Sequence, residues 1–297
     1  MQLLRNTFIN LWSWRCWKTD SDEYHRSWRL CRYIGHCRTK AGEEATKNIN
    51  ADKAAYVQTD ITSEESVKNA MKVASNAFEK RLSGLVHCAG VAMSQPWTNR
   101  LEDTIGRSRR LLEINYMGTY ITNALFADAV NERFEPEKMA SGELFTTKEE
   151  RGAIINFSSI AGHQPYTRIL AYTGGKAAVS AFSRALADFL GPSGIRVNTV
   201  SPSVINSANI GARLPYFLAE LTKTSSFPAR PITPDEIAVG VSLYKFPVLI
   251  KSKGAVNYLI TNGMMNDHDL RIDGFWRFIF DRSVDREDPR LSAPGLE

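Results

Sequence analysis

A short apolar run, a polar turn and a helix that carries a tyrosine and a lysine constrain this chain more than any other stretch. Residues 154–176 read IINFSSIAGHQPYTRILAYTGGK. The apolar run 153–157 is typical of a buried strand, and a turn of two serines follows it. Tyr172 and Lys176 are four residues apart, so on a helix their Cβ atoms lie on one face, about 5–6 Å apart. The stretch therefore predicts a strand–turn–helix unit.

A phenol beside an ammonium gives this unit a chemistry for moving protons. Tyrosine ionises near pKa ~10, and a cation held beside it stabilises the phenolate and lowers that value. Tyr172 would then donate and accept protons near neutral pH, and Ser159 can reach the same reacting oxygen from the strand end. A lone Tyr-x-x-x-Lys is weak, because roughly one chance match is unsurprising in such a chain. The alternative is a half-buried helix tyrosine with a solvated lysine.

Other segments favour the functional interpretation, because they agree in order and spacing with one known family. They read LVHCAG, LEINYMGTY, INFSSIAG, AYTGGKAAVSAFSRALA and GIRVNTVSPS. Together they resemble the short-chain dehydrogenase/reductase family, over about residues 41–277. The resemblance implies an α/β fold, a Rossmann-like doubly wound parallel sheet. It also implies an NAD(P)-dependent oxidoreductase that interconverts a secondary alcohol and a ketone.

The resemblance also assigns four catalytic residues and no metal. It implies that Tyr172 transfers the proton, and that Lys176 lowers its pKa and holds the nicotinamide ribose. Ser159 would fix the carbonyl or alkoxide oxygen. Asn115, in the motif LEINYMGT, matches the family's helix-distorting asparagine, which holds a water in a proton relay to the lysine. An asparagine inside a helix is otherwise a mild cost in stability.

The resemblance places the family's cofactor contacts at three strand ends and on the helix of the tyrosine and lysine. The candidate residues are Asp60, Ile61, Cys88, Ala89, Gly90, Tyr172, Lys176, Pro202, Ser203, Val204 and Ser207. Asp60 matches an acid that bonds the adenine amino group, although it or Ser63 could instead cap a helix at 63–80. The small Ala89 and Gly90 would let the backbone approach the ribose and nicotinamide side.

Several of these positions depart from the family's pattern. His87 and Cys88 stand where the pattern is Asn-Asn, and we interpret them as a structural histidine and a small buried residue. Ser203 replaces a glycine of the segment that closes over the nicotinamide, after a strand at 195–200. Ser207 stands where a threonine often binds the carboxamide or phosphate. Residues 207–228 would form a substrate-covering flap, or equally a packing stripe.

Composition limits the class of protein but does not identify a ligand. The 297 residues suit one α/β domain with extensions, and no run of about 20 apolar residues indicates a membrane span. Four cysteines at irregular spacing match neither a zinc site nor a disulfide framework. The net charge of +5 lies wholly in the first 40 residues, which hold eight basic and three acidic side chains. The remaining chain is neutral, which argues against a nucleic-acid partner.

The first 40 residues depart most from the family, and we treat 1–40 as a separate basic segment rich in Trp and Cys. A dinucleotide-binding domain begins with a strand, a glycine-rich turn and a helix that meets the pyrophosphate. The family's turn is TGxxxGxG, but Gly35 is the only glycine in this segment. The initial strand–turn–helix is therefore expected to be degraded. NAD or NADP is the expected cofactor, with NAD favoured, and the strand end that distinguishes them falls here.

A reading-frame error explains the composition of this segment. A shift of one base turns the tryptophan codon, TGG, into a glycine codon, so Trp12, Trp14 and Trp17 would become closely spaced glycines. We infer that residues from about 10 to 40 are translated out of frame, through a mutation or a faulty gene model. One alternative is a mitochondrial transit peptide, since the first 19 residues hold three basic and no acidic side chains. The other is a divergent or disordered arm.

The predicted domain spans residues 41–280, with a possible insertion at 240–254 and a disordered tail at 281–297. Without the insertion, DEIAV would join AVNYLITNGMMND in one amphipathic helix, for which Thr233 is the expected cap. A retained intron and a genuine loop both remain open. The segment 134–151 is expected to be an exposed loop.

Three further segments lean towards the 3-hydroxyacyl-CoA dehydrogenase type-2 branch of the family: LVHCAGVA, FPARPITPDE and LRIDGFWR. We therefore expect a small-molecule alcohol, ketone or acyl-CoA substrate. We also expect a helix-mediated homodimer or homotetramer in the cytoplasm, or alternatively in mitochondria. The competing hypothesis is a cofactor-deficient pseudoenzyme or oligomeric scaffold.

Overall fold

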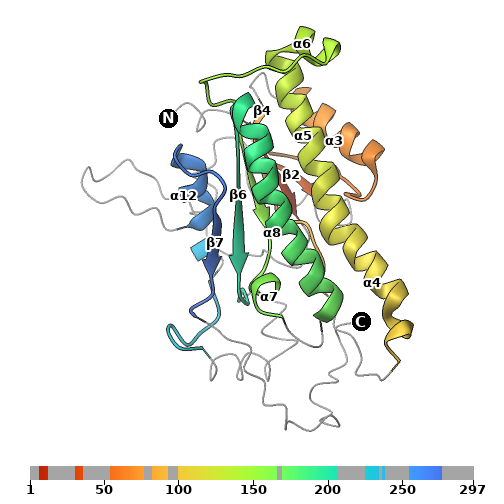
Figure 1. The fold of residues 1–297 in the computed structure, drawn as a ribbon, viewed down its shortest axis with the longest axis vertical. Helices are drawn as coiled ribbons and strands as arrows, with labels where there is room; N and C mark the ends of the chain where they lie inside the picture. Colours follow the sequence, from red (N-terminus) through yellow and green to blue (C-terminus); the bar gives the residue numbers. More distant parts are fainter. Residues whose placement is uncertain are drawn as a thin grey trace, which may run out of the picture.

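A seven-stranded parallel sheet forms the centre of the molecule (Figure 1). The computed structural model describes residues 7–12, 31–35, 54–76, 82–92, 100–165, 169–206, 225–233, 236–237 and 254–275. The strand order is β3-β2-β1-β4-β5-β6-β7, and it reverses between β1 and β4. The predicted doubly wound parallel sheet is therefore confirmed.

The strands are β1 (Thr7–Trp12), β2 (Cys31–Gly35), β3 (Ala54–Gln58), β4 (Leu82–His87), β5 (Gly152–Phe157), β6 (Ile195–Pro202) and β7 (Asp269–Ile272). Every residue of β4, β5 and β6 is buried. Such continuous burial is expected of central parallel strands, because helices cover both of their faces.

Two of these strands come from the segment 1–40. β1 pairs with β4 on one side and with β2 on the other, and β2 pairs with β3, all in parallel. The sheet therefore extends beyond the domain boundary that the sequence suggested at residue 40. Residues 13–30, where a phosphate-binding turn would lie, fall outside the described residues. The reading-frame hypothesis for this segment stays a prediction.

Helices cover the sheet in two layers, and neighbouring strand residues alternate between them. Leu85 and Ile154 belong to the core shared with α3 (Glu64–Asn76), α5 (Gly118–Phe134) and α8 (Leu170–Leu190). The next residues, Val86 and Ile155, belong to the core shared with α12 (Ala255–Thr261). This period of two follows from the alternation of side chains along a strand. Figure 1 shows α12 on one side and α3, α5 and α8 on the other.

Shorter elements complete the described chain: η2 (Leu101–Thr104), α4 (Ile105–Leu112), η3 (Glu113–Met117), α6 (Pro136–Ser141), α7 (Ile160–His163) and η5 (Gly191–Ser193). The motif LEINYMGT lies within one continuous helix, because α4, the π-helical turn η3 and α5 follow one another without a break. No helix within the described ranges is both long and apolar enough to cross a bilayer.

The expectation of a loop at 134–151 was wrong in part, because α6 lies within it. Pro136 opens this helix, and Gly142 ends it in the left-handed conformation at φ 73°. Arg151 anchors the segment: its Nη2 atom lies 2.7 Å from Glu135 Oε1. Its guanidinium also lies 4.9 Å from the centre of the Phe134 ring. The ion pair and the cation–π contact join Arg151 to residues 16 and 17 positions earlier in the chain. The polar composition of the segment therefore suggested a loop and gave no sign of these contacts.

The C-terminal part contains Thr233, the residue expected to cap a helix. Thr233 and Glu236 form a reciprocal turn, in which the backbone N–H of Thr233 donates to Glu236 Oε2 at 2.8 Å. Ile237 packs in the same core as Val256 and Leu259 of α12. Apart from Gly254, the possible insertion at 240–254 lies outside the described residues, as does the tail at 281–297.

His87, the last residue of β4, is a buried titratable group in this core. It is 1% exposed, and burial together with the nearby Lys176 charge lowers its pKa to about 3. The imidazole is therefore neutral in the folded protein over the physiological range. In the unfolded chain the same group ionises near its ordinary pKa of 6.5. The unfolded state thus binds more protons between these two values.

We expect the free energy of unfolding to fall as the pH drops from about 6.5 to about 3, because only the unfolded His87 binds a proton there. The loss should reach the order of 4 kcal/mol at the lower end. His87→Asn removes this contribution, so its unfolding free energy should depend less on pH. Urea titrations across this range measure the slope. His268→Asn, which replaces an exposed histidine, is the matched control. An equal slope in His87→Asn would contradict the account.

Candidate active site

Tyr172 and Lys176 lie in the first two turns of α8, as the predicted strand–turn–helix unit requires. The Lys176 Nζ atom is 5.9 Å from the centre of the Tyr172 ring. Lys176 is only 5% exposed, and its ammonium donates a hydrogen bond to the carbonyl of Phe157 at 2.7 Å. A buried ammonium is costly without partners, so this bond to the end of β5 helps to hold the charge in place.

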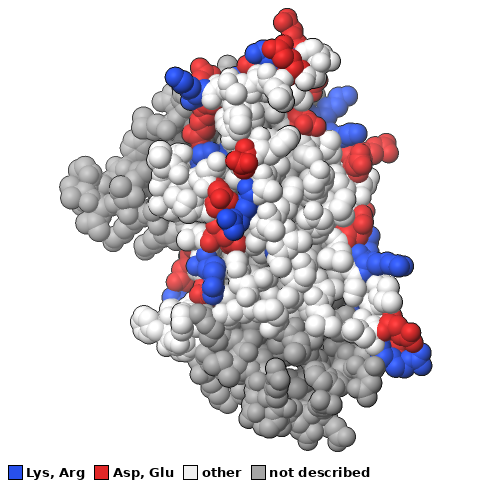
Figure 2. Space-filling model, in the orientation of Figure 1, with Lys and Arg blue, Asp and Glu red and all other residues white. Residues whose placement is uncertain are grey.

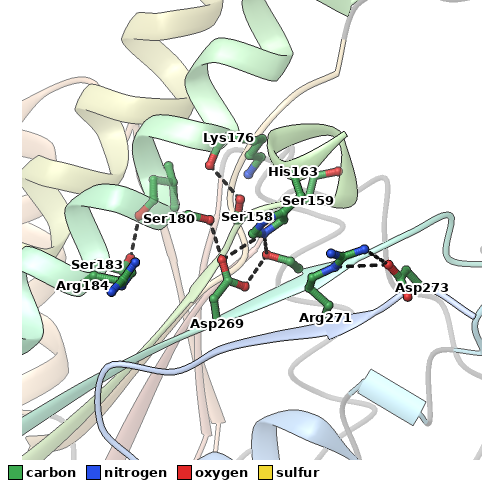
Figure 3. A network of polar contacts seen from close by, with 12 residues as sticks. Ser158, Ser159, His163, Lys176, Ser180, Ser183, Arg184, Asp269, Arg271 and Asp273 are labelled. Atoms are coloured by element: carbon green, nitrogen blue, oxygen red, sulfur yellow. Dashed lines mark hydrogen bonds and ion pairs between the residues drawn. The ribbon is translucent and has the colours of Figure 1, made fainter. Parts of the chain in front are cut away.

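The two serines at the end of β5 hold the turn that follows. Ser158 Oγ donates to the carbonyl oxygen of Lys176 at 2.7 Å. Ser159 caps α7, because its Oγ accepts a hydrogen bond from the backbone N–H of Ala161 at 3.2 Å. Figure 3 shows both serines beside Lys176. Two hydrogen bonds thus join the strand end to the helix: Lys176 donates to Phe157, and Ser158 donates to Lys176.

Gly162 allows α7 to pack directly against α8. A Cβ atom at this position would lie 2.8 Å from the backbone nitrogen of Ala177 and 2.9 Å from the carbonyl carbon of Lys176. Real Cβ atoms essentially never approach so closely, and both neighbours are backbone atoms that cannot move aside. A glycine here therefore fixes the distance between the Ser159 turn and the lysine of α8.

Asn115 lies in the π-helical turn η3, so the predicted helix distortion is present. Its side chain is fully buried and bonds the chain after β4 in both directions: Nδ2 donates to the Val91 carbonyl at 2.8 Å, and Oδ1 accepts from the Val91 N–H at 3.1 Å. The same Nδ2 also donates to the carbonyl of Leu111 at 3.1 Å. This side chain therefore ties the helix to the loop that follows β4.

Gly90 shows that this loop meets the lysine as well. A Cβ atom there would lie 2.7 Å from Asn115 Oδ1 and 3.3 Å from Lys176 Nζ. Three elements therefore converge at this point: the end of β4, η3 and α8. Ala89 is buried, whereas Cys88, which we expected to be a buried residue, is partly exposed and packs against the α12 core.

The candidate residues after β3 are held by local turns. Asp60 Oδ1 accepts from the backbone N–H of Thr62 at 2.9 Å and from its hydroxyl at 2.7 Å. Ser63 accepts from the N–H of Ser66 at 3.2 Å, which makes it the cap of α3. Ile61 is buried and packs closely on Gly118: a Cβ atom on Gly118 would lie 2.7 Å from the Cδ1 atom of Ile61. The helix cap is therefore Ser63, and Asp60 shapes the turn.

The candidate residues after β6 are held by the C-terminal part of the chain. Pro202 ends β6, and the N–H of Ser203 donates to the carbonyl of Ile272 at 2.9 Å. The carbonyl of Val204 accepts from the N–H of Ile232 at 2.9 Å. Ser207 lies outside the described residues, as does most of the expected flap at 207–228.

All the described candidates lie at or beyond the carboxyl ends of strands, or on helices that pack there. Carboxyl ends of parallel strands share one edge of a sheet, where open α/β domains bind ligands next to the point of strand-order reversal. Sequence reasoning did not find a polar cluster beside this edge, formed by His163, Ser180, Ser201 and Asp269. Ser180 is four residues after Lys176, and this spacing is the one signal of the cluster in the sequence.

Comparison with known proteins agrees with this architecture. The short chain dehydrogenase family matches residues 32–214. The 3-hydroxyacyl-CoA dehydrogenase type-2 of Drosophila melanogaster is 29% identical over 245 residues, which cover 80% of this chain and 84% of the relative. The ipsdienol dehydrogenase of Ips pini is 30% identical over 230 residues, covering 76% and 81%.

The solved structures agree as well. A 3-hydroxyacyl-CoA dehydrogenase type-2 from Mycobacterium avium superimposes with a TM-score of 0.70, at 23% identity, covering 94% of this chain and 98% of that protein. At this identity the likeness establishes the fold alone. The family match spans more than half of the sequence. This chain therefore belongs to the short-chain dehydrogenase/reductase family.

Proposed function

We propose that this chain is an NAD(P)-dependent oxidoreductase that interconverts a secondary alcohol and a ketone. The observation that carries the proposal is the convergence of Gly90, Asn115 and the buried Lys176 ammonium at the carboxyl edge of the sheet. Tyr172 stands one helical turn from that ammonium. A buried cation beside a phenol stabilises the phenolate, as a group that gives and regains a proton requires.

The described residues fit the nicotinamide half of a dinucleotide. Gly90 lets the chain after β4 pack directly against Asn115 and Lys176, because a Cβ atom there would lie 2.7 Å from Asn115 Oδ1 and 3.3 Å from Lys176 Nζ. The residues proposed to hold the cofactor are Asp60, Ile61, Cys88, Ala89, Gly90, Tyr172, Lys176, Pro202, Ser203, Val204 and Ser207. A bound nicotinamide supplies or accepts the hydride. NAD is favoured over NADP.

The chain's own side chains would handle the proton and orient the substrate. The Tyr172 phenol gives its proton to the carbonyl oxygen during reduction, and takes it from the hydroxyl during oxidation. The Lys176 ammonium stabilises the phenolate that forms when the proton leaves. Ser159 orients the reacting oxygen with its hydroxyl, and Asn115 completes the relay by which the proton reaches the lysine. Holding these groups in fixed positions lowers the barrier, because little reorganisation is needed at the moment of reaction.

A 3-hydroxyacyl-CoA or a related compound is the proposed substrate. Support comes from two relatives, one named for 3-hydroxyacyl-CoA and the other for an alcohol, ipsdienol. It also comes from the segments around Cys88, Phe227 and Ile272 that resemble the first of these branches. The cytoplasm, or alternatively the mitochondrion, remains the proposed compartment.

We also propose a homodimer or homotetramer that buries the outer faces of the long helices. Exposed apolar side chains gather on α4, η3 and α5, namely Ile105, Leu112, Met117 and Tyr120. Phe182 of α8 contacts Tyr120, with ring centres 5.0 Å apart. Figure 2 shows a broad area of uncharged residues over α8. A second copy of this chain, with the same uncharged face, would be a suitable occupant.

We expect Tyr172→Phe to lower kcat by about 10²–10⁴-fold, because it removes the proton donor and keeps the ring. The binding constant for NAD should stay close to that of the wild type. Turnover of 3-hydroxybutyryl-CoA, followed by NADH absorbance, measures the effect. Tyr258→Phe, on α12 and away from the site, is the matched control and should keep full activity. Unchanged turnover in Tyr172→Phe would rule out the assigned acid.

Calorimetric titration of the chain with NAD and NADP separates an enzyme from a cofactor-deficient copy. We expect saturable binding of one of them, and Gly90→Val should abolish it, since the new side chain would displace Asn115 Oδ1 and Lys176 Nζ, from which a Cβ atom there would lie 2.7 Å and 3.3 Å. Gly106→Val, at a glycine on α4 with nothing near its Cβ position, is the control. If the wild-type chain binds neither cofactor, the pseudoenzyme alternative is favoured instead.

A further inference from the structure

One carboxylate of the C-terminal strand lies at the centre of the polar cluster beside the site. Asp269, the first residue of β7, accepts hydrogen bonds from Ser180 Oγ at 2.6 Å and from His163 Nε2 at 3.0 Å, both on Oδ2. Its Oδ1 accepts from the hydroxyl of Ser201. Figure 3 shows Ser180 and His163 beside the carboxylate. The Asp269 side chain is 12% exposed, so water competes little for these bonds.

The three partners come from three elements that carry the proposed site. His163 is the last residue of α7, one helical turn after Ser159. Ser180 is on α8, one turn after Lys176 and two after Tyr172, on the same face. Ser201 precedes Pro202 at the end of β6. Each contact therefore lies within one turn, or one residue, of a residue assigned to the substrate or the cofactor.

The hydrogen bonds around Asp269 are consistent in their directions. A carboxylate only accepts, so both serine hydroxyls donate to it and the His163 ring must carry its hydrogen on Nε2. The same Nε2 lies 3.1 Å from Ser201 Oγ, whose own hydrogen is already directed at Asp269. The N–H of His163 Nε2 is thus shared between Asp269 Oδ2 and Ser201 Oγ. Bonds to a charged acceptor are shorter and stronger than neutral ones, and they stiffen the elements that they join.

We propose that Asp269 is a positioning residue, which fixes α7, α8 and β6 relative to one another so that Ser159, Tyr172 and Lys176 meet in productive geometry. This inference rests on the proposed function. If the inference holds, turnover depends on the pairing of β7 with β6, although no atom of Asp269 is assigned to the substrate. Displacing a reacting group by about 1 Å can cost about 10²-fold in rate, so small shifts of these elements suffice.

Asp269→Asn tests the inference, because it keeps the size of the side chain and removes the charge and one acceptor. The amide nitrogen cannot accept, so the variant leaves at least one of the three donors without its acceptor. We expect kcat for 3-hydroxybutyryl-CoA with NAD to fall about 10- to 100-fold. KM and the calorimetric NAD affinity should stay within about threefold of wild type. Activities are normalised to the folded fraction, measured by circular dichroism.

Asp267→Asn is the matched control, two residues earlier on the same segment. Its carboxylate pairs with Arg184, at 3.4 Å on the surface, and asparagine tolerates its left-handed backbone at φ 62°. This control should keep the wild-type kcat. His163→Gln should lower kcat in the same direction as Asp269→Asn. The double variant should be no slower than Asp269→Asn alone, since both changes break one network.

Two results would overturn the inference alone. One is a folded Asp269→Asn variant with kcat within twofold of wild type. The other is a loss of kcat matched by an equal loss of cofactor affinity or of folded protein, which would indicate a general structural role. A wild-type chain that binds NAD but turns over no 3-hydroxyacyl-CoA or other secondary alcohol would instead overturn the proposed function, and this inference with it.

Discussion

The hydrogen bond from the Lys176 ammonium to the carbonyl of Phe157 is the contact on which the proposed site depends. It joins helix α8 to the end of β5 and keeps a positive charge inside the molecule, where an unpartnered charge would be strongly unfavourable. The return bond from Ser158 to the carbonyl of Lys176 fixes the same junction from the other side. Because the charge is fixed there, the phenol of Tyr172 and the loop at Gly90 are near a cation that cannot move to solvent.

Close packing around that lysine explains why glycines occupy two of its neighbouring positions. Gly162 lets α7 reach the backbone of α8, and Gly90 lets the chain after β4 reach Asn115 and the ammonium. Asn115 in turn bonds that chain through both atoms of its amide. The turn η3 departs from the α-helical hydrogen-bond pattern at Asn115, and π-helical turns of this kind are frequent at functional sites. Each element is therefore positioned by contacts with the others rather than by its own sequence.

Much of this could be predicted from the sequence because its signals are local or belong to a family pattern. Apolar runs at 153–157 and 195–200 identified central strands, and the four-residue spacing of Tyr172 and Lys176 placed them on one helical face. What the sequence did not reveal depends on contacts between distant residues. Arg151 draws the segment containing α6 onto Phe134, and Asp269 bonds a histidine more than a hundred positions away. The strands β1 and β2 were not predicted, because the segment 1–40 lacks the family's glycine turn that would mark the end of a first strand.

A double-mutant cycle between Tyr172 and Lys176 tests the central claim most directly. If the phenol and the ammonium act as one proton-handling unit, the kcat of Tyr172→Phe combined with Lys176→Met should be about as low as that of the more damaging single variant. If the two losses multiply, so that the double variant is slower by the product of the single effects, then the two side chains act independently and the account is wrong.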